Sequence, residues 1–212
     1  MCGRFYVDPE DRYFRELAEA INRSPLLGRF SGKVPEASGS YGGEVLPASV
    51  VPVLAPNRKG ERAVFPMQWG YTLPPRPDSK KPALVINARS ETAGSKPLFR
   101  ESWGTRRCVI PATAYFEWEH TATPDGKVSV GQKYRIHPLA GPHTFLAGLY
   151  RLEQSLPVFV ILTREPAEDL RRIHDRMPLM LPEESLASWL SPEGDPEKLL
   201  STALTSTAFA AV

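Results

Sequence analysis

The chain has 212 residues, of which 42% are hydrophobic and 24% are charged, and its formal net charge is +2. These values are ordinary for a soluble globular protein, and so small a net charge does not by itself indicate a nucleic-acid partner. The length fits a single domain spanning residues 1–212. The proline content is unusually high, because 22 of the 212 residues are proline, about twice the common share of about 5%. So many prolines argue against long helices.

The first predicted element is a helix after Asp8, with Pro9 at its first position. Residues 23–48 are rich in Gly, Ser and Pro and predict a loop. Short helices are expected near 97–102, after Pro166, after Pro182 and at Asp195-Pro196. Strand-like runs are more numerous, and they lie at 49–54, 63–69, 83–87, 107–112, 114–118, 133–137, 144–150 and 157–163.

The strands do not alternate with helices, so a parallel α/β sheet is not indicated. We expect an α+β fold that is mainly antiparallel β, with a barrel-like core and peripheral helices. Two cysteines, Cys2 and Cys108, are too few for a disulfide framework. No apolar run approaches the about 20 residues of a membrane span, and MCGRF lacks the features of a signal peptide. We therefore expect a cytoplasmic protein without a membrane partner.

Cys2 is the first candidate reactive residue. Removal of Met1, which a small second residue favours, would leave an amine and a thiol on adjacent carbons, and such a pair traps aldehydes. The unperturbed pKa values are about 7.7–8.0 for the amine and about 8.5 for the thiol, so both nucleophilic forms exist in part at neutral pH. The alternative is that Cys2 is simply the second residue of a frayed terminus.

Three further stretches carry polar groups in apolar surroundings: VINARSE with Asn87, AYFEWEH with Glu117, and RIHDRMPLML with His174. Each has a structural alternative. Asn87 could form a hydrogen bond to its own backbone at a strand end, and Glu117 could face solvent. His174 could lie at the C-terminus of a helix and interact favourably with the helix dipole. Together with Cys2, however, they form an inventory for covalent chemistry at a carbonyl. Nothing indicates a metal or another cofactor, because CxxC is absent and the four histidines lack ligand spacing.

The segments MCGRF, INARSET, YFEW and IHDRMPLML, in this order and at these separations, resemble the SRAP family, the SOS response-associated peptidase-like proteins. The resemblance covers residues 1–190. That family shields abasic sites in single-stranded DNA by a covalent crosslink, and its mainly β fold with surrounding helices agrees with the prediction above. The family label also names a peptidase activity, which we expect as a name rather than as the main activity.

The resemblance implies a role for each candidate. Cys2 would be the nucleophile, its amine forming a Schiff base with the ring-opened sugar and its thiol closing a thiazolidine ring. Glu117 would shuttle protons, His174 would assist proton transfer, and Asn87 would position the amine or the sugar. The implied partner is single-stranded DNA containing abasic sites. We expect the protein to be a monomer and to be nucleoid-associated when bound to DNA.

DNA contacts are expected from local basic groups. The resemblance implies that Arg4 and Arg89 contact phosphates near the site. Residues 96–107 carry four cations against one carboxylate, interleaved with aromatic rings, which is typical of a phosphate track with stacking platforms. A solvated basic loop is the alternative. The candidates in this segment are Lys96, Arg100, Trp103, Arg106 and Arg107.

Three segments depart from the family pattern. GGEVLPAS lacks an expected asparagine near residue 45, TLPPRPDSKK replaces a tryptophan-rich segment, and STAFAAV stops short of a closing strand. Two other functions remain open. N-terminal-nucleophile glutamine amidotransferases also begin Met-Cys-Gly, although their Asn-Gly-containing strand and Gly-rich loop are missing here. The second alternative function is non-covalent binding of single-stranded DNA by a protein in which Met1 still blocks Cys2.

Overall fold

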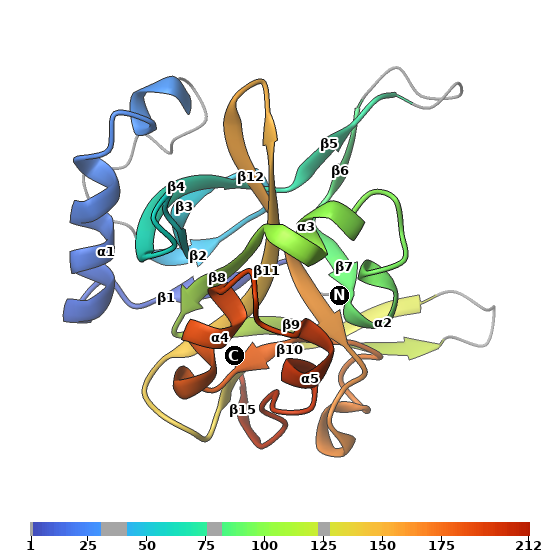
Figure 1. The fold of residues 1–212 in the computed structure, drawn as a ribbon. Coiled ribbons are helices and arrows are strands. Elements are labelled where there is room, and N and C mark those ends of the chain that lie inside the picture. The colour runs from blue at the N-terminus through green and yellow to red at the C-terminus, as the bar shows by residue number, and fades with distance from the viewer. Residues whose placement is uncertain (1, 31–41, 76–81, 123–127) are drawn as a thin grey trace.

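The structure is a computed structural model, and it describes residues 2–30, 42–75, 82–122 and 128–212. Strands dominate the chain, nearly all their pairings are antiparallel, and the short helices lie at the periphery (Figure 1). The predicted fold class, mainly antiparallel β with a barrel-like core and peripheral helices, is therefore confirmed. Within the described ranges, no helix combines the length and the apolar character needed to cross a bilayer.

Five strands close a barrel at the centre of the molecule. They are β3 (Val50–Pro56), β4 (Arg62–Trp69), β8 (Arg107–Ala112), β11 (Thr144–Glu153) and β12 (Leu156–Arg164). Pairing runs from β12 to β4, β3, β8 and β11 and returns to β12, and only the β12–β4 pairing is parallel. The apolar runs of the sequence form these strands because their side chains fill the barrel interior.

Short strands extend the rim of the barrel along β12 and β11. Strand β7 (Asn87–Arg89) pairs parallel to β12, and β13 (Met177–Pro178) pairs antiparallel to it. Strand β14 (Met180–Leu181) pairs with β11. Because Thr163 of β12 lies opposite residues of both β7 and β13, the segments that carry Asn87 and His174 meet at one end of this strand.

A second sheet of five strands packs beside the barrel. Its members are β1 (Phe5–Val7), β2 (Gly43–Val45), β9 (Ala114–Ala122), β10 (Val128–Pro138) and β15 (Thr207–Ala211). The order across the sheet is β15, β10, β9, β1, β2. Strand β1 thus lies directly against β9, which brings the N-terminal residues to the strand that carries Glu117.

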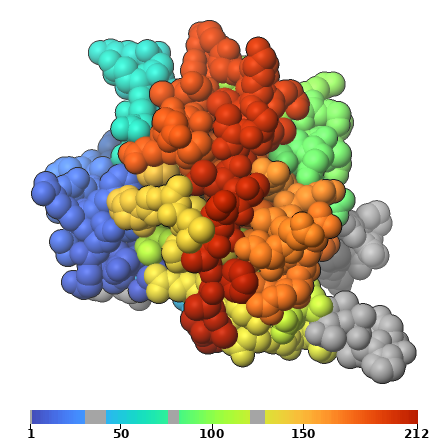
Figure 2. Space-filling model, turned by 90° about the horizontal axis from the view of Figure 1, so that it is seen from below, coloured from blue at the N-terminus to red at the C-terminus, as the bar shows by residue number. Residues whose placement is uncertain are grey.

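The segment STAFAAV at the end of the described chain itself forms a strand. Strand β15 pairs with β10 from Thr207 opposite Pro138 to Ala211 opposite Tyr134. In Figure 2 the red C-terminal segment runs across this face of the molecule. Alanine has low strand propensity, so the sequence STAFAAV carried little signal, and pairing with the edge of β10 decides its conformation.

Helix α1 (Arg12–Asn22) begins later than predicted. The carboxylate of Asp11, not that of Asp8, caps it by accepting the backbone N–H of Tyr13 at 2.8 Å. The predicted helix at Asp195 is confirmed, because Asp195 Oδ1 accepts the N–H of Glu197 at 3.0 Å. The other helices are α2 (Ser90–Ala93), α3 (Arg100–Thr105), α4 (Leu186–Leu190) and α5 (Pro196–Leu200), with 3-10 helices η1 (Leu27–Phe30), η2 (Glu168–Leu170) and η3 (Glu183–Ser185).

The run predicted as one strand at 83–87 divides at Ile86. Residues Ala83–Val85 form β6, which pairs with β5 (Tyr71–Leu73), and β7 then starts at Asn87. The Ile86 carbonyl accepts the indole N–H of Trp69 at 2.9 Å and the N–H of Ile161 at 3.0 Å, which fixes the change of direction. Of the departing segments, GGEVLPAS contributes strand β2, whereas residues 76–81 of TLPPRPDSKK lie outside the described residues.

Candidate active site

Cys2 lies just before β1, where the chain runs beside β9. Its side chain is fully buried, and Sγ is 3.9 Å from the carbonyl oxygen of Arg4. That carbonyl accepts the backbone N–H of Phe116 at 2.9 Å, so the thiol lies next to the middle of β9. Burial raises the pKa of the thiol far above its ordinary value, and the carboxylate of Glu117 raises it further. The thiol therefore needs a base before it can act as a nucleophile.

Asn87 reaches Cys2 from the barrel side. It is the first residue of β7 and lies opposite Ile161 of β12. Its Nδ2 donates a hydrogen bond to the carbonyl oxygen of Cys2 at 2.8 Å. Its Oδ1 is buried and has no hydrogen-bond partner within the described part of the chain. The Nδ2 group of Asn87 thus binds Cys2, while the Oδ1 atom of the same carboxamide can still accept a hydrogen bond beside Cys2.

Glu117 projects from β9 into the interior of the protein. The pairing of β9 with β10 is regular over residues 115–118, so Tyr115 and Glu117 share one face. The side chain of Glu117 is only 5% exposed, which excludes the solvent-facing alternative. Burial raises the pKa of Glu117 to about 7, and the carboxylate of Asp175 also raises it. This carboxyl group can therefore give and accept a proton near neutral pH.

His174 lies on the segment between η2 and β13, and its Nε2 is 3.9 Å from Oε2 of Glu117. On the far side of the ring, Nδ1 accepts the backbone N–H of Arg176 at 3.0 Å and lies 2.7 Å from Oδ1 of Asp175. Burial lowers the pKa of His174 to about 4. The ring is neutral at neutral pH, and because Nδ1 has both a donor and an acceptor beside it, either nitrogen can carry the proton.

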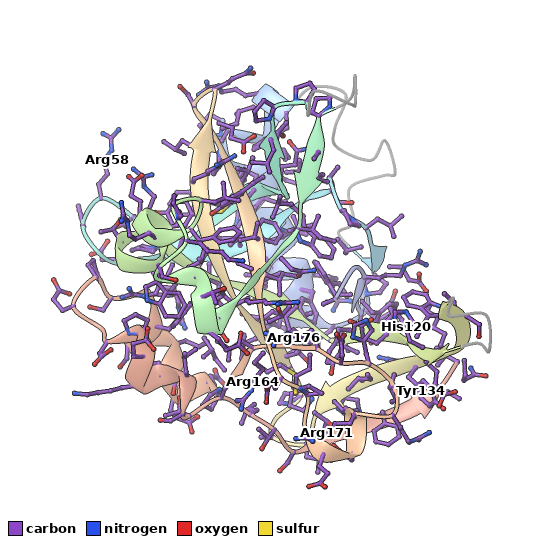
Figure 3. All side chains as sticks on the ribbon, turned by 90° about the vertical axis from the view of Figure 1, so that its right-hand side faces the viewer. Arg58, His120, Tyr134, Arg164, Arg171 and Arg176 are labelled. Atoms are coloured by element: carbon purple, nitrogen blue, oxygen red, sulfur yellow. The ribbon has the colours of Figure 1, made fainter. Side chains whose placement is uncertain are left out.

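Two side chains connect this segment to its surroundings. Arg176 is buried, and its Nη2 donates to Oε2 of Glu91 and to the carbonyl of Thr163, each at 2.8 Å. It therefore joins the segment after Asn87 to the segment after His174. The exposed ring of His120 on β9 lies 4.6 Å from the His174 ring, centroid to centroid. Figure 3 labels both Arg176 and His120, with Arg176 near the centre of this side and His120 on the strand to its right.

The structure thus brings together the four side chains that the sequence suggested. A thiol, a carboxamide, a carboxyl group and an imidazole converge from the start of β1, the start of β7, the middle of β9 and the segment before β13. Such a set can support nucleophilic addition to a carbonyl with local proton transfer. Among the described residues, no group of three or more His, Cys, Asp or Glu side chains is arranged to hold a metal ion.

The predicted phosphate contacts fall into separate places. Arg4 lies on the chain two residues after Cys2, and its Nη1 is 2.5 Å from Oε2 of Glu44. Arg89 is exposed at the end of β7, two residues after Asn87. Both are therefore close to the reactive groups along the chain. Lys96, on the segment that leads into α3, and Arg100, the first residue of α3, are both exposed and lie away from these contacts in sequence.

Two other candidates in segment 96–107, Trp103 and Arg107, are structural, which corrects two predictions. Trp103 is buried against Trp189, with ring centroids 6.2 Å apart. Arg107 is 2% exposed, and its donors bond to the backbone carbonyls of residues 103, 104, 189, 191 and 194. A guanidinium has five N–H donors, so Arg107 has none left for a phosphate. Arg106 remains partly exposed and pairs with Glu101 at 3.0 Å.

The face of the second sheet opposite to Glu117 alternates cations and aromatic rings, which the sequence analysis missed. Lys133 Nζ is 3.9 Å from the ring centroid of Phe116, and Arg4 Cζ is 5.3 Å from that of Trp118. Glu44 pairs with both cations. Only the register of β1, β9 and β10 places these residues together. We term this surface the cation–aromatic face, and it comprises Arg4, Tyr6, Phe116, Trp118, Lys133 and Arg135.

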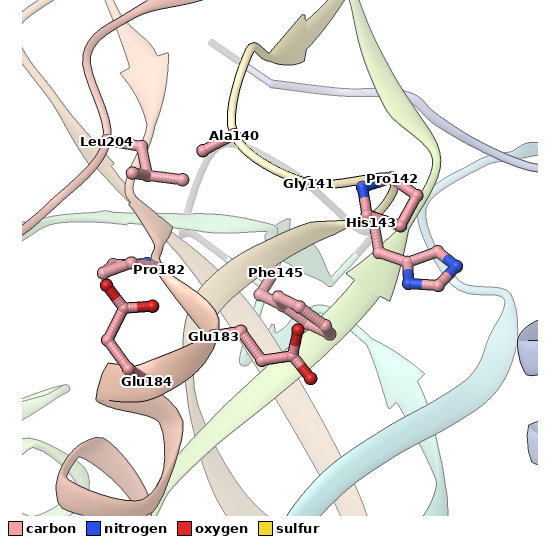
Figure 4. Close-up of a pocket in the computed structure, with 9 residues that line it drawn as sticks. All are labelled: Ala140, Gly141, Pro142, His143, Phe145, Pro182, Glu183, Glu184 and Leu204. Carbon is pink, nitrogen blue, oxygen red and sulfur yellow. The ribbon is translucent and has the colours of Figure 1, made fainter.

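A cavity of about 240 Å³ lies elsewhere, between the β10–β11 turn and η3 (Figure 4). His143 and Glu183 line it, and Nε2 of His143 is 3.0 Å from Oδ2 of Asp11. The nine residues that line this cavity include none of the four reactive side chains. The candidate active site is therefore defined by contacts between buried groups and not by this cavity.

The sequence matches the family model described as SOS response associated peptidase (SRAP) over residues 1–211. It is 31% identical over 210 residues to the abasic site processing protein YobE of Bacillus subtilis, covering 96% of this chain and 89% of that protein. It is 31% identical over 198 residues to the abasic site processing protein YedK of Escherichia coli, and the match covers 91% of this chain and 81% of that protein. The crystal structure of a phage-related protein from Bordetella bronchiseptica matches this structure with a TM-score of 0.67 at 22% sequence identity. The match covers 100% of this chain and 94% of that chain.

These comparisons agree with the fold and the motifs. The Bordetella bronchiseptica structure shows that the same fold occurs in another protein. The family model covers all four segments that carry Cys2, Asn87, Glu117 and His174. Two relatives match this chain at 31% identity over most of their length. The chain is thus a member of the SRAP family.

Proposed function

We propose that this protein captures abasic sites in single-stranded DNA by a thiazolidine crosslink between Cys2 and the sugar. The names of the relatives supply the substrate class, an abasic site. The observation that carries the chemistry is the 2.8 Å hydrogen bond from Asn87 to the carbonyl of Cys2, next to a carboxyl group with a pKa of about 7. It fixes the residue that would hold the reacting amine.

The first step needs Met1 to be removed, because the nitrogen of Cys2 is otherwise part of a peptide bond. The freed amine adds to the C1′ aldehyde of the ring-opened sugar, and the electron pair of the carbonyl moves to its oxygen. One proton from the amine and one from the protonated form of Glu117 convert that oxygen to water, and its loss leaves a protonated Schiff base, the iminium. The available Oδ1 of Asn87 accepts an N–H of the amine and so directs the nitrogen lone pair at C1′.

The second step closes the ring. The S–H proton of Cys2 passes to the carboxylate of Glu117, the sulfur adds to C1′ of the protonated Schiff base, and the electron pair of the C=N bond moves to the nitrogen, which keeps its proton. The net change is the loss of one water, without oxidation or reduction. Ring closure removes the iminium, which would otherwise promote β-elimination and strand cleavage.

His174 supports the proton transfers of Glu117. It faces the carboxyl group across 3.9 Å and is neutral near pH 7, so the proton stays on Glu117 and the polar ring stabilises the carboxylate when that proton is given up. Its second contact, with Arg176 and Asp175 at Nδ1, fixes the ring orientation. A network of this kind suits both formation and reversal of the crosslink.

DNA would lie over the cation–aromatic face and Arg89. The cations of that face contact phosphates, and the partly exposed ring of Trp118 stacks on a base. A single strand is expected because chemistry at C1′ requires an exposed sugar. Lys96, Arg100 and Arg106 are further candidates for backbone contacts at a greater distance along the strand.

Lys133→Ala is expected to weaken binding to single-stranded DNA and to reduce the slope of log affinity against log salt by about 0.7, as for the loss of one phosphate contact. Glu44→Gln should have the opposite effect on affinity, because Glu44 neutralises both Arg4 and Lys133. Lys59→Ala, an exposed lysine in the β3–β4 turn, is the matched control. Fluorescence anisotropy at several salt concentrations measures all three. Equal slopes for Lys133→Ala and Lys59→Ala would contradict this placement of the DNA.

The proposed function is tested by mixing the purified protein with a single-stranded oligonucleotide that carries one abasic site, followed by denaturation and intact mass measurement. The expected adduct has the mass of the protein without Met1 plus the DNA minus one water. It should persist on heating and resist borohydride reduction, whereas an open Schiff base would be reduced. An oligonucleotide with a tetrahydrofuran residue, which cannot open to an aldehyde, is the control and should give no adduct.

The alternatives predict other results in the same experiment. A protein that lacks Met1, binds the oligonucleotide and forms no adduct would be a non-covalent binder. A protein that forms no adduct and releases ammonia from glutamine would be an amidohydrolase of the N-terminal-nucleophile type. Either result would overturn the crosslinking function.

A further inference from the structure

We infer that Tyr115 is part of the reactive centre and that its hydroxyl donates a hydrogen bond to the C1′ oxygen of the abasic sugar while Cys2 adds to C1′. This inference rests on the proposed function. It concerns a side chain that none of the steps above uses and that lies on the same face of β9 as Glu117.

The position of Tyr115 follows from the register of the second sheet. It lies opposite Phe5 of β1 and opposite Ile136 of β10, at the centre of three adjacent strands. The neighbouring residue, Phe116, donates its N–H to the carbonyl of Arg4, and Sγ of Cys2 lies beside that carbonyl. Tyr115 is therefore adjacent both to the strand end that carries Cys2 and to Glu117.

The hydroxyl of Tyr115 has an unusual environment for a buried group. The residue is 0% exposed, and its hydroxyl oxygen has no hydrogen-bond partner among the residues that the structure describes. Nearly all buried polar groups in proteins are paired, and an unpaired one destabilises the folded state. Phenylalanine would fill the same space without that penalty. A partner that is absent from the protein itself, namely the substrate, accounts for the hydroxyl.

The charges near Tyr115 come from the reactive groups. Burial raises the pKa of Tyr115 well above its ordinary value, and the anionic forms of Cys2, Glu117 and Asp169 raise it further. The phenol therefore keeps its proton throughout the reaction and acts only as a hydrogen-bond donor. Asp169 belongs to η2, so the titratable groups that face Tyr115 come from β9, from η2 and from the segment before β1.

The hydrogen bond would act during the first step of the reaction. As the amine of Cys2 attacks C1′, the C=O electron pair moves to the C1′ oxygen, and the O–H of Tyr115 stabilises the negative charge that develops there. Glu117 in its protonated form then supplies the proton with which this oxygen leaves as water. Tyr115 loses no proton and forms no covalent bond. A preorganised donor at such a site commonly raises the rate by about 100-fold or more.

The test compares Tyr115→Phe with wild type and with Tyr71→Phe. Tyr71 is an equally buried tyrosine whose hydroxyl contacts Ser102 Oγ at 3.5 Å, so it controls for the loss of a buried hydroxyl. Three quantities are measured: the unfolding temperature, the affinity for single-stranded DNA with a tetrahydrofuran residue, and the crosslinking rate at saturating abasic DNA. For Tyr115→Phe we expect an unfolding temperature equal to or above that of wild type, unchanged affinity, and a crosslinking rate lowered at least about tenfold.

Each other outcome decides the question. A crosslinking rate that falls by less than about tenfold, or a marked fall in unfolding temperature, would overturn the role of Tyr115 while the proposed function stands, because wild type still crosslinks. If the wild-type protein without Met1 forms no adduct, the proposed function itself fails and the inference falls with it. Tyr71→Phe should crosslink at the wild-type rate, and a loss equal to that of Tyr115→Phe would also overturn the inference.

Discussion

A Cys2→Ala variant is expected to give a yield of heat-stable adduct with abasic DNA that is more than about 100-fold below that of wild type, because only the thiol can close the ring after the amine has reacted. Alanine is small enough for Met1 still to be removed, so the amine remains. The variant should therefore form a Schiff base that borohydride can trap. Without the trap, that Schiff base should lead to β-elimination, so cleaved oligonucleotide should increase as the heat-stable adduct disappears.

The second cysteine supplies the matched control for this prediction. Cys108 is also fully buried, but it lies on β8 in the barrel, opposite Gly148 of β11. Cys108→Ala should crosslink at the wild-type level. Denaturing gels with and without borohydride separate the three species: heat-stable adduct, reduced Schiff base and cleaved strand. A heat-stable adduct of Cys2→Ala at the wild-type yield would show that the thiol takes no part.

Much of this fold is readable from the sequence because its strands are apolar runs bounded by turn residues. The runs at 107–112, 144–150 and 157–163 became β8, β11 and β12 of the barrel with small changes at their ends. The closure of the barrel is a different matter. It depends on the parallel contact of β12 with β4, which joins segments far apart in sequence and leaves no local pattern.

The candidate site was identifiable as a set of residue types but not as a geometry. A buried carboxyl group at Glu117 could not be told from a solvent-facing one, because strand alternation gives two faces and not which face is inside. The hydrogen bond from Asn87 to Cys2 requires β7 to sit on β12 and β1 to sit on β9. No spacing within the sequence encodes that meeting of two sheets.

Arg107 shows where local charge is misleading. A basic segment with interleaved aromatic residues predicted a phosphate track, yet Arg107 binds five backbone carbonyls and Trp103 is buried. Both side chains pack into the interior around α3, so burial and not charge sets their role. The cation–aromatic face was missed for the converse reason, since its members lie on three strands whose register the sequence does not reveal.

Glu117 and His174 are expected to give opposite pH dependences to the free energy of unfolding. Glu117 has a pKa of about 7 in the folded protein against 4.5 without perturbation, so its contribution to stability is complete below pH 4.5 and is lost as the pH rises to about 7. His174 has a pKa of about 4 against 6.5, so its contribution is complete above pH 6.5 and is lost as the pH falls to about 4. Between pH 4.5 and 6.5 the two effects nearly cancel.

Glu117→Gln should therefore be more stable than wild type at pH 8 by up to about 3 kcal/mol, because glutamine mimics the neutral carboxyl group that burial favours. The advantage should disappear near pH 4.5, where Glu117 is protonated in the folded protein. His174→Gln should show the reverse pattern, losing the stabilisation that wild type gains between pH 4 and 6.5. Denaturant unfolding at pH 4.5, 6, 7 and 8 measures these differences, and comparison with wild type at each pH cancels the other titrating groups.

The same Glu117→Gln variant should crosslink more slowly by about 100-fold or more and lose any inflection near pH 7 in its rate profile, since glutamine cannot transfer a proton. Its matched control is Glu119→Gln, a carboxylate two residues further along β9 that is partly exposed and lies 3.6 Å from Arg172. That control should retain both the wild-type rate and its pH dependence. A Glu117 variant that is slower but also less stable at pH 8 would show that the carboxylate supports the fold. A Glu117 variant that is more stable at pH 8 but crosslinks more slowly would show that the buried carboxylate destabilises the folded protein and is needed for proton transfer.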